Sequence, residues 1–259
     1  MLNTLGRVLR FESRYARLPP LILVNGLAEQ GETWFRNIPV WRKHFEIHAP
    51  NILAYDGDAL HERIDSRQPI SVDYIVEELR LYLHKFVQRP PYHLGGSSTG
   101  GKVVAEFAHR YPKLVDKLIL FGPSGVSDVE RLPVVQGVRR HDVTALVDSV
   151  FHNPRRADPR LLGYYKEKMA SRRWRIGLIK TIRGTLGHSI REKLAELPMP
   201  TMMFVGLNDS IVDPGQAIEA GKTIPKGKLV TFDKCGHAPH LEYTRQVNKL
   251  VIQFLKAGG

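Results

Sequence analysis

One short stretch of the chain holds residue types that could serve two different chemistries. Residues 95–103 read GGSSTGGKV. Counted as Gly-x-x-x-x-Gly-Lys, the stretch is close to a phosphate-binding loop, but that loop needs a Ser or Thr after its lysine to ligate Mg²⁺, and Val103 stands there instead. Counted as Gly-x-Ser-x-Gly, it is the tight strand-to-helix turn that presents a nucleophilic serine, here Ser98 between Gly96 and Gly100.

A serine nucleophile of this kind needs an acid and then a histidine later in the chain, and both occur in that order. Asp209 comes just after the β-rich run 201–205, and His237 comes just after the β-rich run 228–232. The carboxyl ends of neighbouring parallel strands share one edge of a sheet, which is where ligands bind in open α/β folds. We therefore expect Ser98, Asp209 and His237 to converge there.

Each of these residues has a competing interpretation. Asp209 is also of a type that suits a turn or a helix cap, and Asp213 is the alternative acid. His240 is the nearest competing histidine, although His237 stands out by its Gly and Pro neighbours. The single cysteine, Cys235, is expected to be a small packed residue and not a second nucleophile.

The expected roles follow from the chemistry of acyl transfer. Ser98 would attack a carbonyl, and His237 would take its proton and later give it to the leaving group. Asp209 would hold the imidazole in its productive tautomer. The backbone N–H of Thr99, at the start of the helix, would point at the developing oxyanion.

The elements that position these residues alternate along the chain. Strand-like runs are expected at 21–24, 45–48, 92–94, 117–121, 201–205 and 228–232, and helices at 72–86, 103–108, 216–222 and 246–255. Ser71 precedes the first of these helices as a plausible N-cap. Such alternation predicts a mainly parallel sheet with helices on both faces. Residues 126–197 lack strand-like runs, so the sequence predicts one core, 1–125 with 198–259, and a helical insertion between them.

Composition excludes several classes of protein. The chain has 259 residues, 42% of them hydrophobic and 25% charged, which is typical of a soluble globular protein. It has no apolar run of the ~20 residues that span a bilayer and no signal-peptide pattern, so a cytoplasmic location is the expectation. The formal charge of +12 is spread along the chain without a nucleic-acid-binding motif, so no nucleic-acid partner is expected.

With these motifs in place, the chain resembles the α/β-hydrolase superfamily over nearly its whole length. The resemblance lies in GGSSTGG at the serine turn, PTMMFVGLNDSIV at the acid strand and CGHAPHLE at the histidine. It implies an α/β-hydrolase fold with a mostly parallel, eight-stranded sheet and a helical cap at 126–197. The cap sequence ASRRWRIGLIKTI is most similar to the branch of meta-cleavage-product hydrolases and related esterases.

The resemblance also assigns binding residues, with two departures. Family members open the first oxyanion-hole loop with His-Gly, whereas this chain has Asn25-Gly26-Leu27, where Asn25 could bond the loop backbone and Leu27 N–H would be the second oxyanion donor. The loop after Pro50 reads NILAYDGDAL and departs from the family's glycine-rich pattern. Ser97 could line the pocket or only suit the turn.

In the cap, Arg172, Arg173 and Trp174 could hold a substrate carboxylate and stack on a ring. The same cluster could instead be a solvated helix face with one buried aromatic.

The sequence thus predicts a serine hydrolase without cofactor or metal that cleaves an ester of a small or medium organic acid through an acyl-enzyme. The alternatives are a C–C bond hydrolase of a vinylogous diketo acid and a ligand-binding member of the fold with little turnover. The expected partner is a small-molecule substrate, and the basic cap favours an anionic one. The oligomeric state stays open.

Overall fold

The computed structural model describes residues 9–11, 18–131, 135, 137, 140 and 142–257. Its strands form a single sheet in the order β1-β3-β2-β4-β5-β6-β7, in which only β1 runs antiparallel to its neighbour. The strands are β1 (Leu9–Phe11), β2 (Pro20–Val24), β3 (Glu46–Ala49), β4 (Tyr92–Ser97), β5 (Val115–Phe121), β6 (Thr201–Gly206) and β7 (Gly227–Phe232). The predicted fold class, a mostly parallel sheet with helices, is confirmed.

The expected number of strands differs from the observed one. The described residues form seven strands, one fewer than the eight implied by the family resemblance. On one side the sheet ends at β1, which pairs with β3 through Leu9 opposite Ala49. Whether a segment forms a strand at the sheet edge depends on its pairing with residues far away in the chain, and a local sequence pattern does not show that pairing.

The sheet separates two hydrophobic cores because side chains alternate along its strands. In β2, Leu21 and Leu23 face one core, while Ile22 and Val24 face the other. The first core contains Trp34, Trp41 and the apolar face of the last helix, and the second contains most of the remaining helices. Both faces of the central strands are therefore buried, as the continuous apolar runs in their sequences predict.

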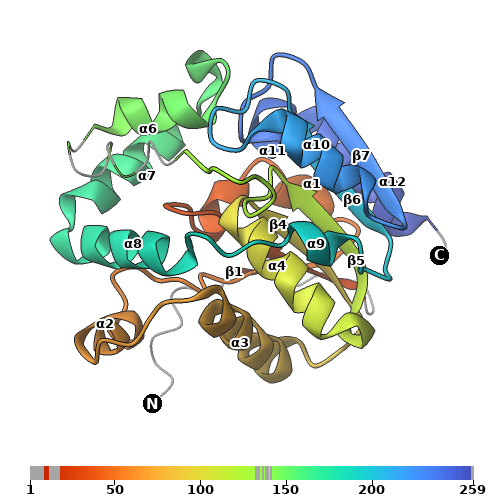
Figure 1. The fold of residues 1–259 in the computed structure, drawn as a ribbon, viewed down its shortest axis with the longest axis horizontal. Helices are drawn as coiled ribbons and strands as arrows, with labels where there is room; N and C mark the ends of the chain where they lie inside the picture. Colours follow the sequence, from red (N-terminus) through yellow and green to blue (C-terminus); the bar gives the residue numbers. More distant parts are fainter. Residues whose placement is uncertain are drawn as a thin grey trace.

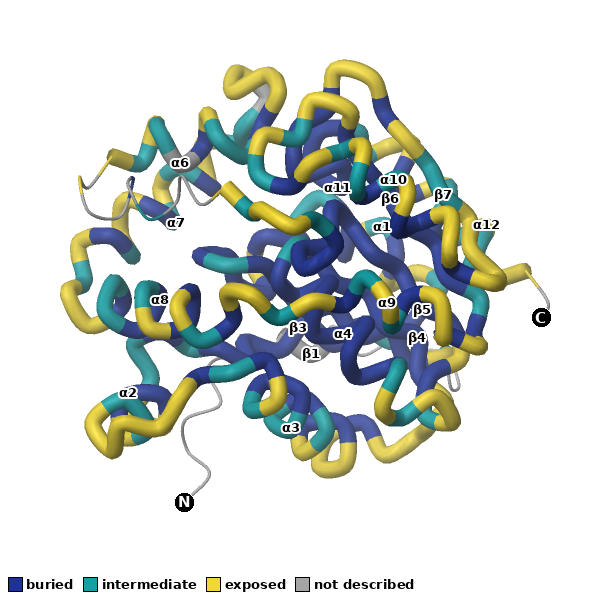
Figure 2. Tube along the Cα trace, viewed as in Figure 1, coloured by how far each residue is buried: buried dark blue, intermediate teal, exposed yellow. Residues whose placement is uncertain are grey.

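The helices cover both faces of the sheet (Figure 1). They are α1 (Ile38–Trp41), α2 (Asp58–Asp65), α3 (Val72–Tyr82), α4 (Thr99–Arg110), α6 (Val143–Val150), α7 (Pro159–Ala170), α8 (Arg172–Thr185), α9 (Arg191–Leu194), α10 (Pro214–Lys222), α11 (Pro239–Glu242) and α12 (Thr244–Lys256). The Ser71 hydroxyl accepts the N–H of Tyr74 at 3.3 Å and caps α3, as the sequence predicts. The buried strands lie beneath exposed outer helix faces in Figure 2.

Between β5 and β6 the described residues form helices and no strand. Helices α6, α7 and α8 lie together beside the sheet in Figure 1, whereas α9 lies against α4. Part of this segment, residues 132–134, 136, 138–139 and 141, falls outside the described ranges. Among the described helices, none combines the length and the apolar character that crossing a membrane requires.

Candidate active site

Ser98 occupies a strained turn between β4 and α4. Its φ is +51° and its ψ is −118°, a conformation that L-residues rarely adopt and that persists only where the surroundings enforce it. Ser98 N–H donates to the carbonyl of Phe121 at 3.0 Å, and the Ser98 carbonyl accepts the N–H of Lys102 at 3.1 Å. Strand β5 and the first turn of α4 thus hold the serine in this conformation.

The two glycines of the turn are required by close backbone contacts. A Cβ on Gly96 would lie 2.4 Å from the carbonyl oxygen of Gly100. A Cβ on Gly100 would lie 2.2 Å from the carbonyl oxygen of Val24, on the neighbouring strand β2. Real Cβ contacts are not this short, so any larger residue would push β2, β4 and α4 apart. The Gly-x-Ser-x-Gly pattern therefore has a steric origin here.

Two further predicted residues are in direct contact. Nδ1 of His237 lies 2.7 Å from Oδ2 of Asp209. The other carboxylate oxygen of Asp209 accepts the backbone N–H groups of Ile211 at 2.8 Å and Val212 at 3.1 Å. The carboxylate is thereby fixed in position and the imidazole ring is oriented by it.

The alternative acid and the alternative histidine have other contacts. Asp213 accepts the N–H of Gln216 at 2.8 Å and is the N-cap of α10. His240 is fully buried, with its ring centroid 4.6 Å from that of Trp34. Burial, together with His237, lowers the pKa of His240 to about 3, so its ring is neutral and packs as an aromatic side chain.

The environment of His237 favours its protonated form. Burial by itself lowers the pKa of His237, but the charge and hydrogen bond of Asp209, and then Glu29 and Glu130, raise it above the ordinary value. Its Nε2 is buried and has no hydrogen-bond partner among the described residues. A catalytic hydrogen bond is often long before substrate binds, so an unpaired Nε2 suits a base that awaits a proton.

The loop after β2 is held by its own polar side chains. Asn25 Nδ2 donates to the carbonyl of Glu29 at 2.7 Å, and Gly26 N–H donates to Oε2 of Glu29 at 2.8 Å. Ala28, between them, has a φ of +63°. Asn25 therefore bonds the loop backbone as the sequence suggests. Leu27, in the turn of the same loop, is partly buried.

Glu29 is a residue that the sequence analysis missed. Its carboxyl group is buried, with 7% of the residue exposed. Burial raises its pKa, although the Gly26 N–H, His237 and Ser97 each favour the ionised form. A glutamate in a surface loop is ordinarily solvated, so no local pattern distinguishes this one. The only hint in the sequence is that Glu29 lies close to Asn25-Gly26, where the chain departs from the His-Gly of the family.

Glu242 supports the histidine loop. Its Oε1 accepts the N–H of Gly236 at 2.6 Å and that of His152 at 3.3 Å, and Oε2 accepts the N–H of Asn153 at 3.4 Å. This carboxylate ties the loop that carries His237 to the segment after α6. Cys235 is buried, as expected for a packed residue.

Of the cap residues singled out from the sequence, Arg173 and Trp174 contact the segment before and at the start of α2. Arg172 and Arg173 are exposed, and the Arg173 guanidinium donates to Asp58 Oδ1 at 2.6 Å and to the carbonyl of Asp56 at 2.8 Å. Trp174 is fully buried and meets the ring of Tyr55 edge-to-face. These contacts join α8 to the start of α2, and they lend no support to a role for the three residues in substrate binding.

Lys102 does not present its ammonium group to a phosphate. It is 2% exposed, and its Nζ donates to the carbonyl of Thr185 at 3.1 Å and lies 3.6 Å from Glu130 Oε2. Burial lowers its pKa, and Glu130 partly compensates. The phosphate-loop interpretation therefore fails because its lysine is used to join α4 to α8.

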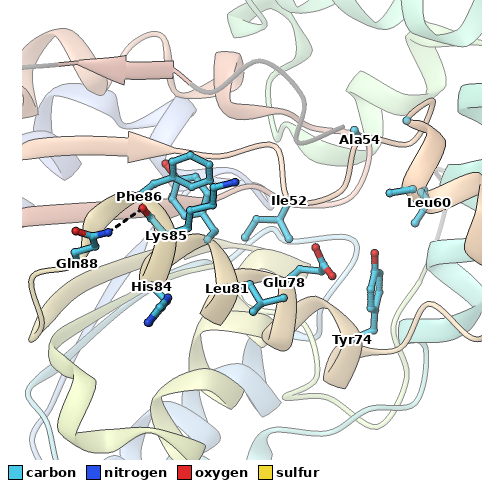
Figure 3. Close-up of a pocket in the computed structure, with 13 residues that line it drawn as sticks. Ile52, Ala54, Leu60, Tyr74, Glu78, Leu81, His84, Lys85, Phe86 and Gln88 are labelled. Carbon is cyan, nitrogen blue, oxygen red and sulfur yellow. Dashed lines mark hydrogen bonds between the residues drawn. The ribbon is translucent and has the colours of Figure 1, made fainter. Parts of the chain in front are cut away.

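A hollow lies along α3 (Figure 3). It has a volume of about 670 Å³, and its walls include Tyr74, Glu78 and Leu81 of α3 together with Ile52 and Phe86. None of Ser98, Asp209 and His237 lines it. This groove is mainly apolar and carries no arrangement of groups typical of acyl transfer.

The family model described as serine aminopeptidase, S33, matches residues 67–244, more than half of the chain. The chain belongs to this family, within the α/β-hydrolase superfamily, and is a serine hydrolase of that fold. The resemblance drawn from its motifs is confirmed.

Individual relatives are distant. The chain is 21% identical over 269 residues to the monoacylglycerol lipase ABHD6 of Mus musculus. This match covers 95% of the present chain and 78% of the lipase. It is 26% identical over 176 residues to a 2-hydroxy-6-oxononadienedioate/2-hydroxy-6-oxononatrienedioate hydrolase of Pseudomonas sp, covering 63% of this chain and 62% of that one.

Among solved structures, the chain is similar to the meta-cleavage product hydrolase of Pseudomonas fluorescens, with a TM-score of 0.78 and 21% identity. The match covers 92% of this chain and 90% of that one. At this identity the likeness concerns the fold alone.

Proposed function

We propose that the chain hydrolyses esters of small or medium organic acids through an acyl-enzyme, with Ser98, His237 and Asp209 as the catalytic residues. The observation that carries the proposal is the 2.7 Å contact between His237 Nδ1 and Asp209 Oδ2. The strained turn of Ser98 supports it. A buried, oriented imidazole with an unpaired Nε2 is the base that such a serine needs.

Each step of the proposed reaction is assigned to a group of the protein. The Ser98 hydroxyl oxygen attacks the ester carbonyl carbon while His237 Nε2 takes the hydroxyl proton. The negative charge on the carbonyl oxygen is stabilised by the N–H groups of Leu27 and Thr99. When the C–O bond breaks, His237 gives its proton to the leaving alkoxide. Water then attacks the acyl-enzyme, its proton passes through His237 to Ser98, and the acid is released.

We also propose that residues 126–197 form a cap over this site. Two contacts between this segment and the core support the assignment. The N–H of His237 donates to the carbonyl of Val150, at the end of α6, at 2.8 Å. Lys102 of α4 donates to the carbonyl of Thr185, the last residue of α8. The cap is thereby attached both to the histidine loop and to the helix that follows Ser98.

Ester cleavage is favoured over cleavage of a vinylogous diketo acid by the charges around His237. A diketo acid carries a carboxylate that calls for a cation nearby. The charged groups that raise the pKa of His237 are instead the carboxylates Asp209, Glu29 and Glu130. The guanidinium of Arg173, which the sequence suggested as a partner for a substrate carboxylate, forms an ion pair with Asp58.

The test is intact-mass spectrometry after treatment with a fluorophosphonate probe, on the wild type and on Ser98→Ala. One adduct on the wild type and none on the variant is the expected result. An unlabelled but folded wild type would contradict a serine nucleophile. Turnover of a panel of p-nitrophenyl and glycerol esters, with a diketo acid as comparison, then separates ester from C–C cleavage.

A further inference from the structure

Glu29 is a buried carboxyl group near the proposed catalytic residues that the mechanism above does not use. A methyl group in place of the Gly26 hydrogen would lie 3.0 Å from Ser98 Cβ and 3.2 Å from Glu29 Oε2. The carboxylate and the nucleophile therefore flank the same glycine. Glu29 also accepts the Gly26 N–H through its side chain, and its backbone carbonyl accepts from Asn25.

These hydrogen bonds fix the conformation of the loop that contains Leu27. The turn closes on itself, with Glu29 N–H donating to the Gly26 carbonyl at 3.3 Å and Ala28 held at positive φ between them. Because the Gly26 N–H is taken up by Glu29, the N–H of the next residue, Leu27, is the one left to face a substrate oxygen. A shift of this loop would therefore weaken one of the two proposed oxyanion donors.

Several titratable groups surround Glu29 and His237. His237 is approached by Asp209 after β6, Glu130 after β5, Glu29 after β2 and the neutral ring of His240 on α11. Glu29 is approached by His237 and by three tyrosines whose phenols burial keeps protonated, Tyr55, Tyr164 and Tyr165. The hydroxyl of Tyr164 is buried and has no hydrogen-bond partner among the described residues, whereas that of Tyr55 is buried beside the backbone of Ala28.

The charge around the site is thus opposite in sign to that of the chain. The formal net charge is +12, yet the charged groups that act most strongly on the pKa of His237 are carboxylates. Glu130 is partly compensated by Lys102 at 3.6 Å, whereas none of the described residues forms an ion pair with Glu29. A negative group in a water-poor site repels anions and favours neutral or cationic groups.

We propose that Glu29 is a positioning and specificity-determining residue, which holds the oxyanion loop and makes the site select uncharged or cationic esters over anionic ones. This inference rests on the proposed function. It replaces the anionic substrate expected from the basic cap, because Lys168, Arg173 and Lys193 of the cap are engaged in ion pairs. The unpaired hydroxyl of Tyr164 would donate to a polar oxygen of an uncharged substrate.

The experiment compares three p-nitrophenyl esters of similar size: the neutral valerate, the anionic hemisuccinate, and the ester of a butyric acid that bears a trimethylammonium group. For the wild type we expect kcat/KM for the neutral and cationic esters to exceed that for the anionic ester by about ten-fold or more. Glu29→Gln keeps an oxygen that can accept the Gly26 N–H but removes the charge. It should narrow the preference several-fold, mainly through a lower KM for the anionic ester.

Two readouts separate this role from a merely structural one. Glu29→Gln should move the acidic limb of the kcat/KM profile to lower pH, because a negative charge that supports the imidazolium is lost. Glu29→Ala, which also frees the loop, should lower kcat on the order of ten- to hundred-fold. Glu219→Gln, an exposed charge on α10 paired with Lys222, is the control for net charge and should change neither readout.

The outcomes distinguish the two proposals. A wild type that the fluorophosphonate labels, but that shows equal or better kcat/KM for the anionic ester, overturns the role of Glu29 alone. So does a Glu29→Gln variant with unchanged preference and unchanged pH profile. A folded wild type that is neither labelled nor active on any ester overturns the proposed function and this inference together.

Discussion

Asp209 and His237 are 28 residues apart in the chain and meet through a 2.7 Å contact between Oδ2 and Nδ1. The contact joins the loop after β6 to the loop after β7, and these strands are neighbours in the sheet. The second carboxylate oxygen is held by the backbone N–H groups of Ile211 and Val212. The pair is therefore built from two loops that the sheet brings together, and it does not depend on substrate for its geometry.

Replacing this acid should impair catalysis far more than folding. In Asp209→Asn the amide can no longer stabilise an imidazolium, so kcat should fall on the order of 10⁴-fold, as for the acid of other serine hydrolases. Asp213→Asn retains an N-cap oxygen for α10 and should change kcat less than about two-fold. Steady-state kinetics on a neutral ester, with circular dichroism of both variants, measures this. Equal losses in the two variants would contradict the assignment of Asp209.

The activity should depend on the ionisation of His237. Its pKa is raised above the ordinary histidine value of 6.5, and the reaction needs the neutral ring. The kcat/KM of the wild type should therefore rise with pH through a midpoint above 6.5. In Asp209→Asn the main raising influence is lost, so the midpoint of the residual activity should move to lower pH. A wild-type midpoint below 6.5 would contradict the arrangement described.

The same group links stability to pH. Because the folded state raises the pKa of His237, the protonated ring stabilises the fold at pH values below its unfolded pKa. That contribution is lost as the pH rises through the folded pKa. The difference in free energy of unfolding between the wild type and His237→Gln should therefore shrink with rising pH over this window. Urea unfolding at a series of pH values measures it, and a difference that grows with pH would contradict the linkage.

The serine turn should tolerate no side chain at its first glycine. Gly96→Ala puts a Cβ where the Gly100 carbonyl oxygen lies only 2.4 Å away, so we expect a loss of about 4 kcal/mol or more in the free energy of unfolding. Gly163→Ala is the matched control, because nothing lies within 4 Å of its Cβ in helix α7. It should stabilise the protein by about 0.5–1 kcal/mol. Thermal and urea unfolding compare the two variants, and a well-folded Gly96→Ala would show that the turn is not close-packed.

The contact between α4 and α8 should matter for stability and not for nucleotide binding. Lys102→Met removes the ammonium group that bonds the Thr185 carbonyl and faces Glu130, so we expect a loss of about 2–4 kcal/mol. Addition of Mg-ATP to the wild type should leave its melting temperature unchanged. A melting temperature raised by Mg-ATP in the wild type and not in Lys102→Met would instead support a phosphate site at this loop.

Much of the fold was predictable from local sequence. The apolar runs that form β2, β5 and β6 are buried on both faces, so each is continuous and easily recognised in the sequence. The Gly-x-Ser-x-Gly turn was equally easy to recognise in the sequence. Gly96 and Gly100 are required there by close contacts with residues a few positions away or on the adjacent strand. The order of serine, acid and histidine then predicted which residues would share one sheet edge.

What the sequence could not determine depends on contacts between residues far apart in the chain. It could not choose between Asp209 and Asp213, because both are turn-forming aspartates and only packing shows which one meets His237. It offered no sign that Lys102 would be buried against Thr185, 83 residues away. Nor could it show that Glu29 lies inward, or that Arg173 turns to Asp58. The sign of the charge around the site is a tertiary property, because composition counts charges and only the folded chain determines which of them are excluded from water.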